Sequence, residues 1–262
     1  MINILDVSNV GIRFGGLQAL KNVSLVVGKD RISALIGPNG AGKTTLFNII
    51  SGFLTPNEGK IIYEGKEIQG MPPFKLTEIG ISRTFQNTRL LQDMTVLENV
   101  QLGYHCKMKQ AFYDVIFQTK KYNNEEKKSK NDALEVLEFA GMVDLKDEFA
   151  KNLPYGYQKK LEIARTIATG ARLILLDEPC AGMNTAEKEA LGVLIESINR
   201  DLKKTILLIE HDMRFVMNLS KSITVLNQGR VIAEGEPTEI QNNPYVIEAY
   251  LGRTKGGGQT SA

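Results

Sequence analysis

The chain has 262 residues, of which 42% are hydrophobic and 24% charged, so it can build one sizeable core or two joined subdomains. A formal net charge of +2 without a clustered basic face argues against a nucleic-acid partner. The sequence shows neither a signal-peptide pattern nor an apolar run near the ~20 residues of a membrane helix, and its two cysteines form no spaced framework. A cytoplasmic protein is therefore expected.

The first third of the chain has the pattern of strands and turns. Apolar residues recur at or near every second position over residues 2–7, 10–14 and 23–27. A short apolar strand at 31–36 then leads into a glycine-rich loop. A helix is expected to follow over 44–51 and to end at Gly52.

The middle of the chain is expected to be helical. Thr95 and Glu98 have the spacing of a capping box, which predicts the start of a helix. The polar stretch 120–131 fits either a solvated linker or the exposed face of a helix, and helical spacing of apolar residues continues over 132–140. We therefore expect a helical insert over roughly 88–165 within an α/β domain.

The last third alternates between expected strands and helices. The strands are predicted over 173–177, 205–209, 222–226 and 230–233. The first two are almost wholly apolar, as strands buried on both faces of a parallel sheet are. The alternation favours a largely parallel sheet covered by helices. The glycine-rich tail 255–262 is expected to be disordered.

The most specific motif is the segment Gly37–Thr44, which matches the complete pattern G-x-x-x-x-G-K-[ST]. Its glycines let backbone N–H groups approach phosphate oxygens, and the helix that follows directs its positive end at the same phosphates. Lys43 adds a charge near the β- and γ-phosphates, and Thr44 offers a hydroxyl to Mg²⁺. Because the motif follows an apolar strand and opens a helix, it predicts an ATP site.

Three further side chains are placed to act on a bound nucleotide. Asp177 ends the strand predicted at 173–177, and Glu178 follows it. At the carboxyl edge of a parallel sheet they would face the phosphate loop, with Asp177 holding Mg²⁺ and Glu178 acting as general base. His211 follows a second strand and would reach the same edge. The competing interpretations are a helix cap or surface carboxylate pair for the acids and an ordinary histidine for His211.

For three other residues the local sequence pattern does not settle a functional role. Phe14 suits either the core or stacking on an adenine ring. Gln86 indicates little by itself, although it precedes the helical insert. His105 lies in no comparable context and is interpreted as an ordinary residue.

The motifs, in their order along the chain, resemble those of the ATP-binding subunit of an ABC transporter from Leu5 to Gly252. The resemblance implies an α/β fold of the P-loop NTPase class: a core with a parallel sheet, an N-terminal antiparallel β subdomain and an inserted helical subdomain. It also implies a single ATP-binding domain over 1–254 that hydrolyses ATP with Mg²⁺.

The resemblance also implies roles for individual residues. Catalytic roles fall on Glu178, His211 and Lys43. The implied Mg²⁺ ligands are Thr44, Gln86 and Asp177, with Gln86 also moving with the contact to a membrane subunit. The residues implied to bind the nucleotide are Phe14, Gly37, Pro38, Asn39, Gly40, Ala41, Gly42, Lys43, Thr44, Thr45, Gln86 and Gly156.

One motif departs from the usual form of this family. The signature Leu-Ser-Gly-Gly-Gln corresponds here to residues 153–157, where Pro154 replaces the serine, Tyr155 the first glycine and Tyr157 the glutamine, while Gly156 is kept. The family serine contacts the γ-phosphate held by a partner subunit, whereas proline has neither a hydroxyl nor an N–H. We therefore expect a weakened or rebalanced second ATP site.

The stretches 13–20, 83–86, 90–99 and 243–252 are similar to the larger of the two ATP-binding subunits of branched-chain amino acid importers. That likeness implies a heterodimer with a related ATPase, or a homodimer in isolation. It further implies two permease subunits at the inner face of the cell membrane and an extracytoplasmic solute-binding protein. The alternatives are an importer of urea, amides or another solute, a non-transport ABC ATPase, and a soluble P-loop enzyme such as a small-molecule kinase.

Overall fold

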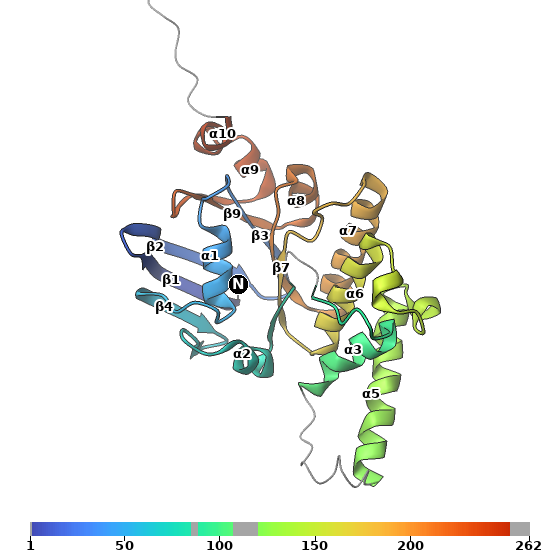
Figure 1. The fold of residues 1–262 in the computed structure, drawn as a ribbon. Coiled ribbons are helices and arrows are strands. Elements are labelled where there is room, and N and C mark those ends of the chain that lie inside the picture. Colours follow the sequence, from blue (N-terminus) through green and yellow to red (C-terminus); the bar gives the residue numbers. More distant parts are fainter. Residues whose placement is uncertain (1, 85–88, 107–119, 252–262) are drawn as a thin grey trace, which may run out of the picture.

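The computed structural model describes residues 2–84, 89–106 and 120–251 (Figure 1). Within these residues, one antiparallel sheet has the strand order β2-β1-β4-β5. Its strands are β1 (Asn3–Phe14), β2 (Leu17–Gly28), β4 (Glu58–Tyr63) and β5 (Lys66–Glu67). β1 is one strand, not the two that the alternation predicts, because its pairing with β2 continues past an irregularity at Asn9. Asn9 has a φ of 54°, and its N–H donates to Ser24 Oγ at 2.9 Å.

The second sheet of the described chain has the order β10-β9-β3-β8-β7-β6. Its strands are β3 (Ile32–Ile36), β6 (Ile81–Arg83), β7 (Leu173–Asp177), β8 (Thr205–Ile209), β9 (Ser222–Asn227) and β10 (Arg230–Gly235). The pairs from β9 to β6 are parallel, and β10 is antiparallel to β9. β3, β7 and β8 are buried at every position, which agrees with their apolar sequences.

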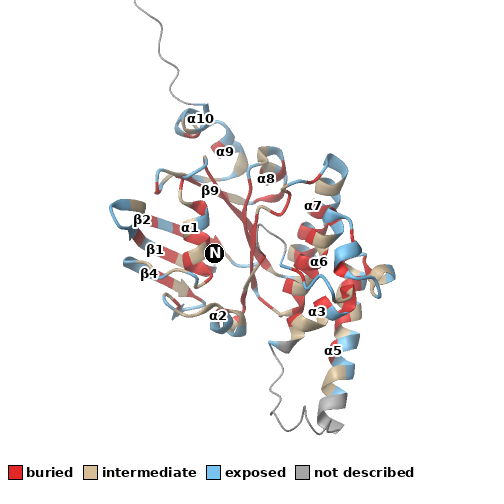
Figure 2. Ribbon diagram, viewed as in Figure 1, coloured by how far each residue is buried: buried red, intermediate tan, exposed pale blue. Residues whose placement is uncertain are grey.

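The parallel sheet contributes to two separate apolar clusters, one on each face, and its central strands are buried (Figure 2). In β7, Leu173 and Leu175 join the cluster that contains α1 (Lys43–Ile50) and the antiparallel sheet. Ile174 and Leu176 face the other way, into the cluster beneath the remaining helices. The alternation of side chains along a strand therefore divides the core in two, and the carboxyl edge of the sheet lies between the layers.

The remaining helices cover the parallel sheet and extend beyond it (Figure 1). Their bounds are α2 (Pro73–Ile79), α3 (Val96–His105), α5 (Lys120–Phe139), α6 (Tyr155–Ala168), α7 (Thr185–Leu202), α8 (Met213–Leu219), α9 (Pro237–Gln241) and α10 (Pro244–Leu251), with 3₁₀ turns at Val143–Leu145 and Ala150–Asn152. The polar stretch 120–131 lies in α5, so it is a helix and not a linker.

The chain between β6 and β7 carries α3, α5 and α6 out to one side of the sheet (Figure 1). The predicted start of α3 is confirmed, because Thr95 Oγ1 accepts from the Glu98 N–H at 3.2 Å and Glu98 Oε2 accepts from the Thr95 N–H at 2.7 Å. No helix in the described ranges is both long and apolar enough to cross a bilayer. The expected tail 255–262 lies outside the described residues.

Candidate nucleotide site

A tight loop at 37–42 connects the central strand β3 to α1. Gly37 has a φ of 148° and Gly42 a φ of 104°. A Cβ on Gly37 would lie 2.0 Å from the Leu226 carbonyl oxygen, and one on Gly42 would lie 2.6 Å from Leu20 Cδ2. Both positions therefore require glycine, which lets the loop backbone pack directly on its neighbours.

The turn between β9 and β10 is hydrogen-bonded to this loop. The Gly229 N–H donates to the Ala41 carbonyl at 2.9 Å, and the Gly229 carbonyl accepts from the Lys21 N–H at 2.7 Å. A Cβ on Gly229 would lie 2.4 Å from the Ala19 carbonyl oxygen. One glycine thus joins the loop, β2 and the C-terminal hairpin.

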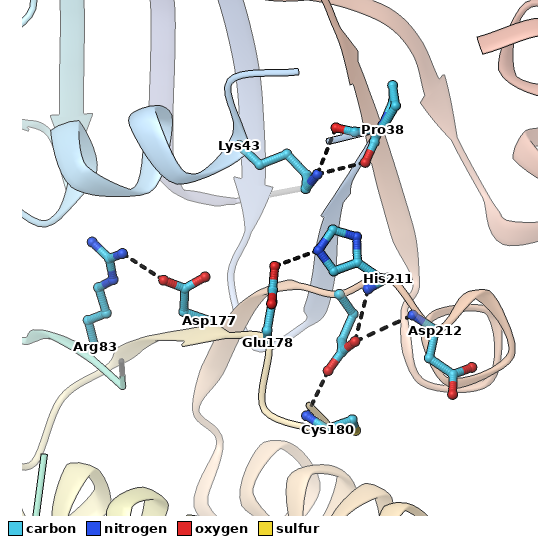
Figure 3. Close-up of polar contacts among 10 residues, drawn as sticks. Pro38, Lys43, Arg83, Asp177, Glu178, Cys180, His211 and Asp212 are labelled. Carbon is cyan, nitrogen blue, oxygen red and sulfur yellow. Dashed lines mark hydrogen bonds and ion pairs between the residues drawn. The ribbon is translucent and has the colours of Figure 1, made fainter. Parts of the chain in front are cut away.

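Lys43, the first residue of α1, carries its ammonium into the loop. Its Nζ donates to the Gly37 carbonyl at 2.6 Å and to the Pro38 carbonyl at 3.0 Å (Figure 3). Only 5% of the residue is exposed. Burial lowers the pKa of Lys43, while the charges of Glu178 and Asp177 act to raise it. A buried cation inside a glycine-rich loop has the charge that attracts a phosphate group.

A cavity of about 650 Å³ opens in front of the loop. The residues that the sequence predicts for this site and that line the cavity are Phe14, Asn39, Gly40, Ala41, Gly42, Lys43, Thr44, Thr45, Glu178 and His211. Phe14 is 46% exposed, so it is not a core residue, and its ring is accessible for stacking. The structure therefore brings the end of β1, the phosphate loop and the carboxyl edge of the sheet to one place.

Part of the cavity wall comes from residues that the sequence motifs did not indicate. Leu17, Gln18, Ala19 and Lys21 line it from β2, and Gln228 lines it from the turn before β10. The only local pattern near these residues is the glycines at 15–16 and 229, which predict turns. A predicted turn does not indicate which distant part of the chain it will contact.

Asp177 ends β7 and is buried, with 4% of the residue exposed. Its Oδ2 accepts from Arg83 Nη2 at 2.7 Å (Figure 3). The Asp177 N–H donates to Thr84 Oγ1 at 3.3 Å. The partner of the carboxylate is thus a residue at the end of β6, the neighbouring strand.

Glu178 follows directly in a left-handed conformation, with a φ of 47°. Its N–H donates to the Ile209 carbonyl at 2.9 Å, which ties it to the end of β8. Its Oε1 lies 2.5 Å from His211 Nε2 (Figure 3). With the proton on Nε2, His211 donates to Glu178, and the two residues from neighbouring strands form one unit at the edge of the cavity.

Below this pair, the buried carboxylate of Glu210 joins two loops. Its Oε1 accepts from the Cys180 N–H at 2.7 Å. Its Oε2 accepts from the N–H groups of His211 at 2.9 Å and Asp212 at 3.4 Å. Glu210 therefore fixes the segment after Glu178 to the segment that carries His211, a role that the sequence did not indicate.

Five of the expected site residues are not among those that line the cavity: Gly37, Pro38, Asp177, Gln86 and Gly156. Gln86 lies outside the described residues. Gly156 is in the first turn of α6 and does not border this cavity. A Cβ on Gly156 would lie 2.8 Å from Glu187 Oε1, so the start of α6 packs closely on the start of α7.

The donor set fits a magnesium ion that is bound together with a nucleotide. Among the described residues there is no group of three or more His, Cys, Asp or Glu side chains that could hold a metal ion by itself. Mg²⁺ is typically bound by one or two carboxylates with substrate phosphates and water. The hydroxyl of Thr44, which lines the cavity, and the carboxylate of Asp177 at the end of β7 are suited to that kind of coordination.

A glycine loop between a central parallel strand and a helix, with an acidic pair ending a nearby strand, defines a P-loop nucleotide-binding protein. A family model described as "ABC transporter" matches residues 20–181, and a second, described as "Branched-chain amino acid ATP-binding cassette transporter", matches residues 230–255. The chain belongs to the ABC transporter family, as one of its ATP-binding cassettes.

Named relatives agree with this assignment over almost the whole chain. The branched-chain amino acid transport ATP-binding protein BraF of Pseudomonas aeruginosa is 43% identical, and the alignment covers 95% of this chain and 98% of BraF. The high-affinity branched-chain amino acid transport ATP-binding protein LivG of Escherichia coli K12 is 42% identical, and the alignment again covers 95% of this chain and 98% of LivG. The crystal structure of an ABC transporter cassette in its ADP conformation is 35% identical, with a TM-score of 0.84, covering 97% of this chain and all of that one.

Proposed function

We propose that this chain binds Mg-ATP and hydrolyses it to drive the import of branched-chain amino acids. The observation that most supports the substrate class is the 42–43% identity along 98% of BraF and LivG, both named for branched-chain amino acid transport. The match at residues 230–255 to the branched-chain model points to the same class, and it lies outside the catalytic motifs.

In this proposal the cavity holds ATP with its phosphates in the loop. The ring of Phe14 stacks on the adenine, the loop from Gly37 to Thr45 surrounds the phosphates, and Lys43 exchanges its carbonyl partners for phosphate oxygens. Thr44 and Asp177 would hold Mg²⁺, which when bound would supply positive charge against the charge that develops on the phosphates. Gln86 remains a third proposed ligand.

Glu178 is the proposed general base. Its carboxylate lines the cavity and accepts a proton from the attacking water. His211, 2.5 Å away, orients that carboxylate and stabilises its position next to the γ-phosphate. The support for these roles is geometric, because both side chains border the same cavity as Lys43.

The second half of the ATP site is proposed to come from another cassette. A related cassette, 26% identical with a TM-score of 0.74, was solved as a dimer bound to ADP and Pi. The backbone N–H groups at the start of α6, including that of Gly156, would face the nucleotide of the partner. Because Pro154 contributes no donor, we propose a heterodimer with a related ATPase.

Two permease subunits are the proposed membrane partners, and they would hold this chain at the inner face of the membrane. A second cavity, of about 400 Å³, lies between the end of α1, α2 and β6. Phe53 and Phe74 line it and are 47% and 62% exposed. Exposed aromatic side chains around a hollow are suited to take an apolar segment of a permease. Arg83 lines the same cavity and contacts Asp177.

The complete assembly provides the test. This chain is produced together with two permease subunits, a second ATPase and a solute-binding protein from the same organism, and the assembly is reconstituted into liposomes. Leucine, isoleucine or valine is expected to stimulate ATP hydrolysis and to accumulate inside, and Glu178→Gln in this chain is expected to suppress both. Accumulation of urea or an amide, but of no branched-chain amino acid, would replace the proposed substrate class while leaving the ATPase role intact.

A further inference from the structure

Arg83 stands between the phosphate-loop helix and the proposed magnesium carboxylate. Its Nη2 donates to Asp177 Oδ2 at 2.7 Å, and its Nη1 donates to Asn48 Oδ1 and to Ser51 Oγ, both at 2.8 Å. The side chains of Arg83 and Asp177 are each 6% exposed. One buried guanidinium thus connects the last residue of β7 with the C-terminal half of α1.

Aromatic rings hold this guanidinium in place. Its carbon lies 5.6 Å from the centroid of Phe47 and 5.9 Å from that of Phe53. Contacts of this length between a guanidinium and a ring are attractive, and more so when water is excluded. Arg83 is therefore fixed in position, and it can fix the orientation of what it binds because its planar fork directs each hydrogen bond.

The arrangement leaves the other oxygen of Asp177 for a ligand. Within the part of the chain that the structure describes, no hydrogen bond to Asp177 Oδ1 is formed. In Figure 3, Arg83 approaches the carboxylate from the side away from Glu178 and Lys43. The bond to Oδ2 therefore selects which edge of the carboxylate faces the phosphate loop.

We propose that Arg83 is the positioning residue of the magnesium site: it orients Asp177 so that Oδ1 receives the metal bound to the nucleotide. This inference rests on the proposed role of Asp177. Hydrogen-bond partners behind a ligating carboxylate typically change metal affinity by about 10–100-fold when they are removed. A purely structural ion pair would instead affect folding without a selective effect on the metal.

The experiment measures metal affinity rather than turnover. In a Glu178→Gln background at saturating ATP, the free Mg²⁺ concentration that gives half of the metal-dependent rise in unfolding temperature is determined for each variant. Arg83→Gln is expected to raise it about 10–100-fold, while the Kd for ATP in EDTA stays unchanged. Arg83→Lys keeps the charge but not the fork, and a rise of several-fold is expected.

Two controls separate the possible failures. Arg172→Gln removes another arginine–carboxylate pair, to Glu64, which does not contact Asp177, and it should leave the Mg²⁺ midpoint unchanged. Asp177→Asn should raise the midpoint at least as much as Arg83→Gln does. A wild-type midpoint in both Arg83 variants beside a raised one in Asp177→Asn overturns the role of Arg83 alone. A wild-type midpoint in Asp177→Asn overturns the metal site itself. If Arg83→Gln does not fold, a wild-type midpoint in Arg83→Lys suffices to overturn the inference.

Discussion

At the scale of single residues, Glu178 combines an unusual backbone with a directed side chain. A φ of 47° at a residue with a Cβ costs about 1 kcal/mol or more, so the surrounding contacts must hold it. The hydrogen bond from its N–H to Ile209 and the contact with His211 do so. Because of this turn, Asp177 contacts Arg83 while Glu178 contacts His211.

Glu178→Gln keeps the size and the backbone of this residue but cannot accept a proton. We expect the Kd for Mg-ATP to stay within a few-fold of wild type, while kcat falls by roughly 10²–10⁴-fold, as for the loss of other general bases. Steady-state hydrolysis and equilibrium binding measure the two effects separately. Unchanged turnover would assign the base to another group.

Glu210 is the other residue whose substitution we expect to affect the site from a distance. In Glu210→Gln the amide group cannot accept from all of the backbone N–H groups of Cys180, His211 and Asp212, so one buried donor loses its partner. The expected cost is about 1–3 kcal/mol of unfolding free energy, with a lower kcat. Urea unfolding measures it, and Glu189→Gln on the exposed face of α7 is the control. Equal stability of both variants would contradict this role.

At the scale of elements, the strands that position the site could be predicted and their partners could not. β3, β7 and β8 are apolar at most positions, which indicates strands buried on both faces, and the phosphate loop follows directly from its glycines. β1 was predicted as two strands because local alternation cannot detect pairing that continues across an irregularity. The walls at Lys21 and Gln228 come from long-range pairing, which leaves no local pattern.

The contact between α3 and α6 gives a prediction at this scale. A Cβ on Gly103 would lie 2.5 Å from the Arg165 carbonyl oxygen and 2.7 Å from Ala168 Cβ, so Gly103→Ala must push the helices apart. We expect it to destabilise the fold by about 1–3 kcal/mol.

Gly192→Ala in α7 is the matched control, because its Cβ would meet only the edge of the Phe215 ring at 3.4 Å. Alanine is favoured over glycine in a helix by about 0.5–1 kcal/mol, so this variant should be at least as stable as wild type. Thermal unfolding of both variants measures the difference. Similar destabilisation by both variants would contradict the claim that close packing at Gly103 causes the loss of stability.

At the scale of the whole molecule, the cassette is asymmetric in how complete its motifs are. Residues of the phosphate loop line one cavity together with Glu178, and Asp177 directly precedes Glu178, whereas α6 has Pro154 at its N-cap position and no side-chain cap. The pairing of Arg83 with Asp177 joins residues far apart in the sequence and was not predictable, because neither residue type indicates its partner. The proposed heterodimer follows from this difference between the complete nucleotide-binding motifs and the altered signature at the start of α6.

Association of the isolated chain tests that asymmetry. With Glu178→Gln and Mg-ATP, we expect the protein to remain largely monomeric, because proline at the start of α6 offers no donor to a partner's nucleotide. The substitution Pro154→Ser is expected to increase ATP-dependent dimerisation, as measured by analytical ultracentrifugation. Tight dimerisation of the isolated chain that keeps Pro154, or fast ATP hydrolysis by the isolated wild-type chain, would argue for a homodimer.

The hydrogen bond between Gly229 and the phosphate loop affects the order in which the protein folds during its synthesis. β3 lies between β8 and β9, and the loop that follows it is bound by Gly229, so every neighbour of the phosphate loop on that side is translated late. At about 5–20 residues per second, the nascent chain carries the loop for on the order of ten seconds before these partners emerge from the ribosome. We therefore expect the complete nucleotide site to form only after β8, β9 and the turn at Gly229 have been translated.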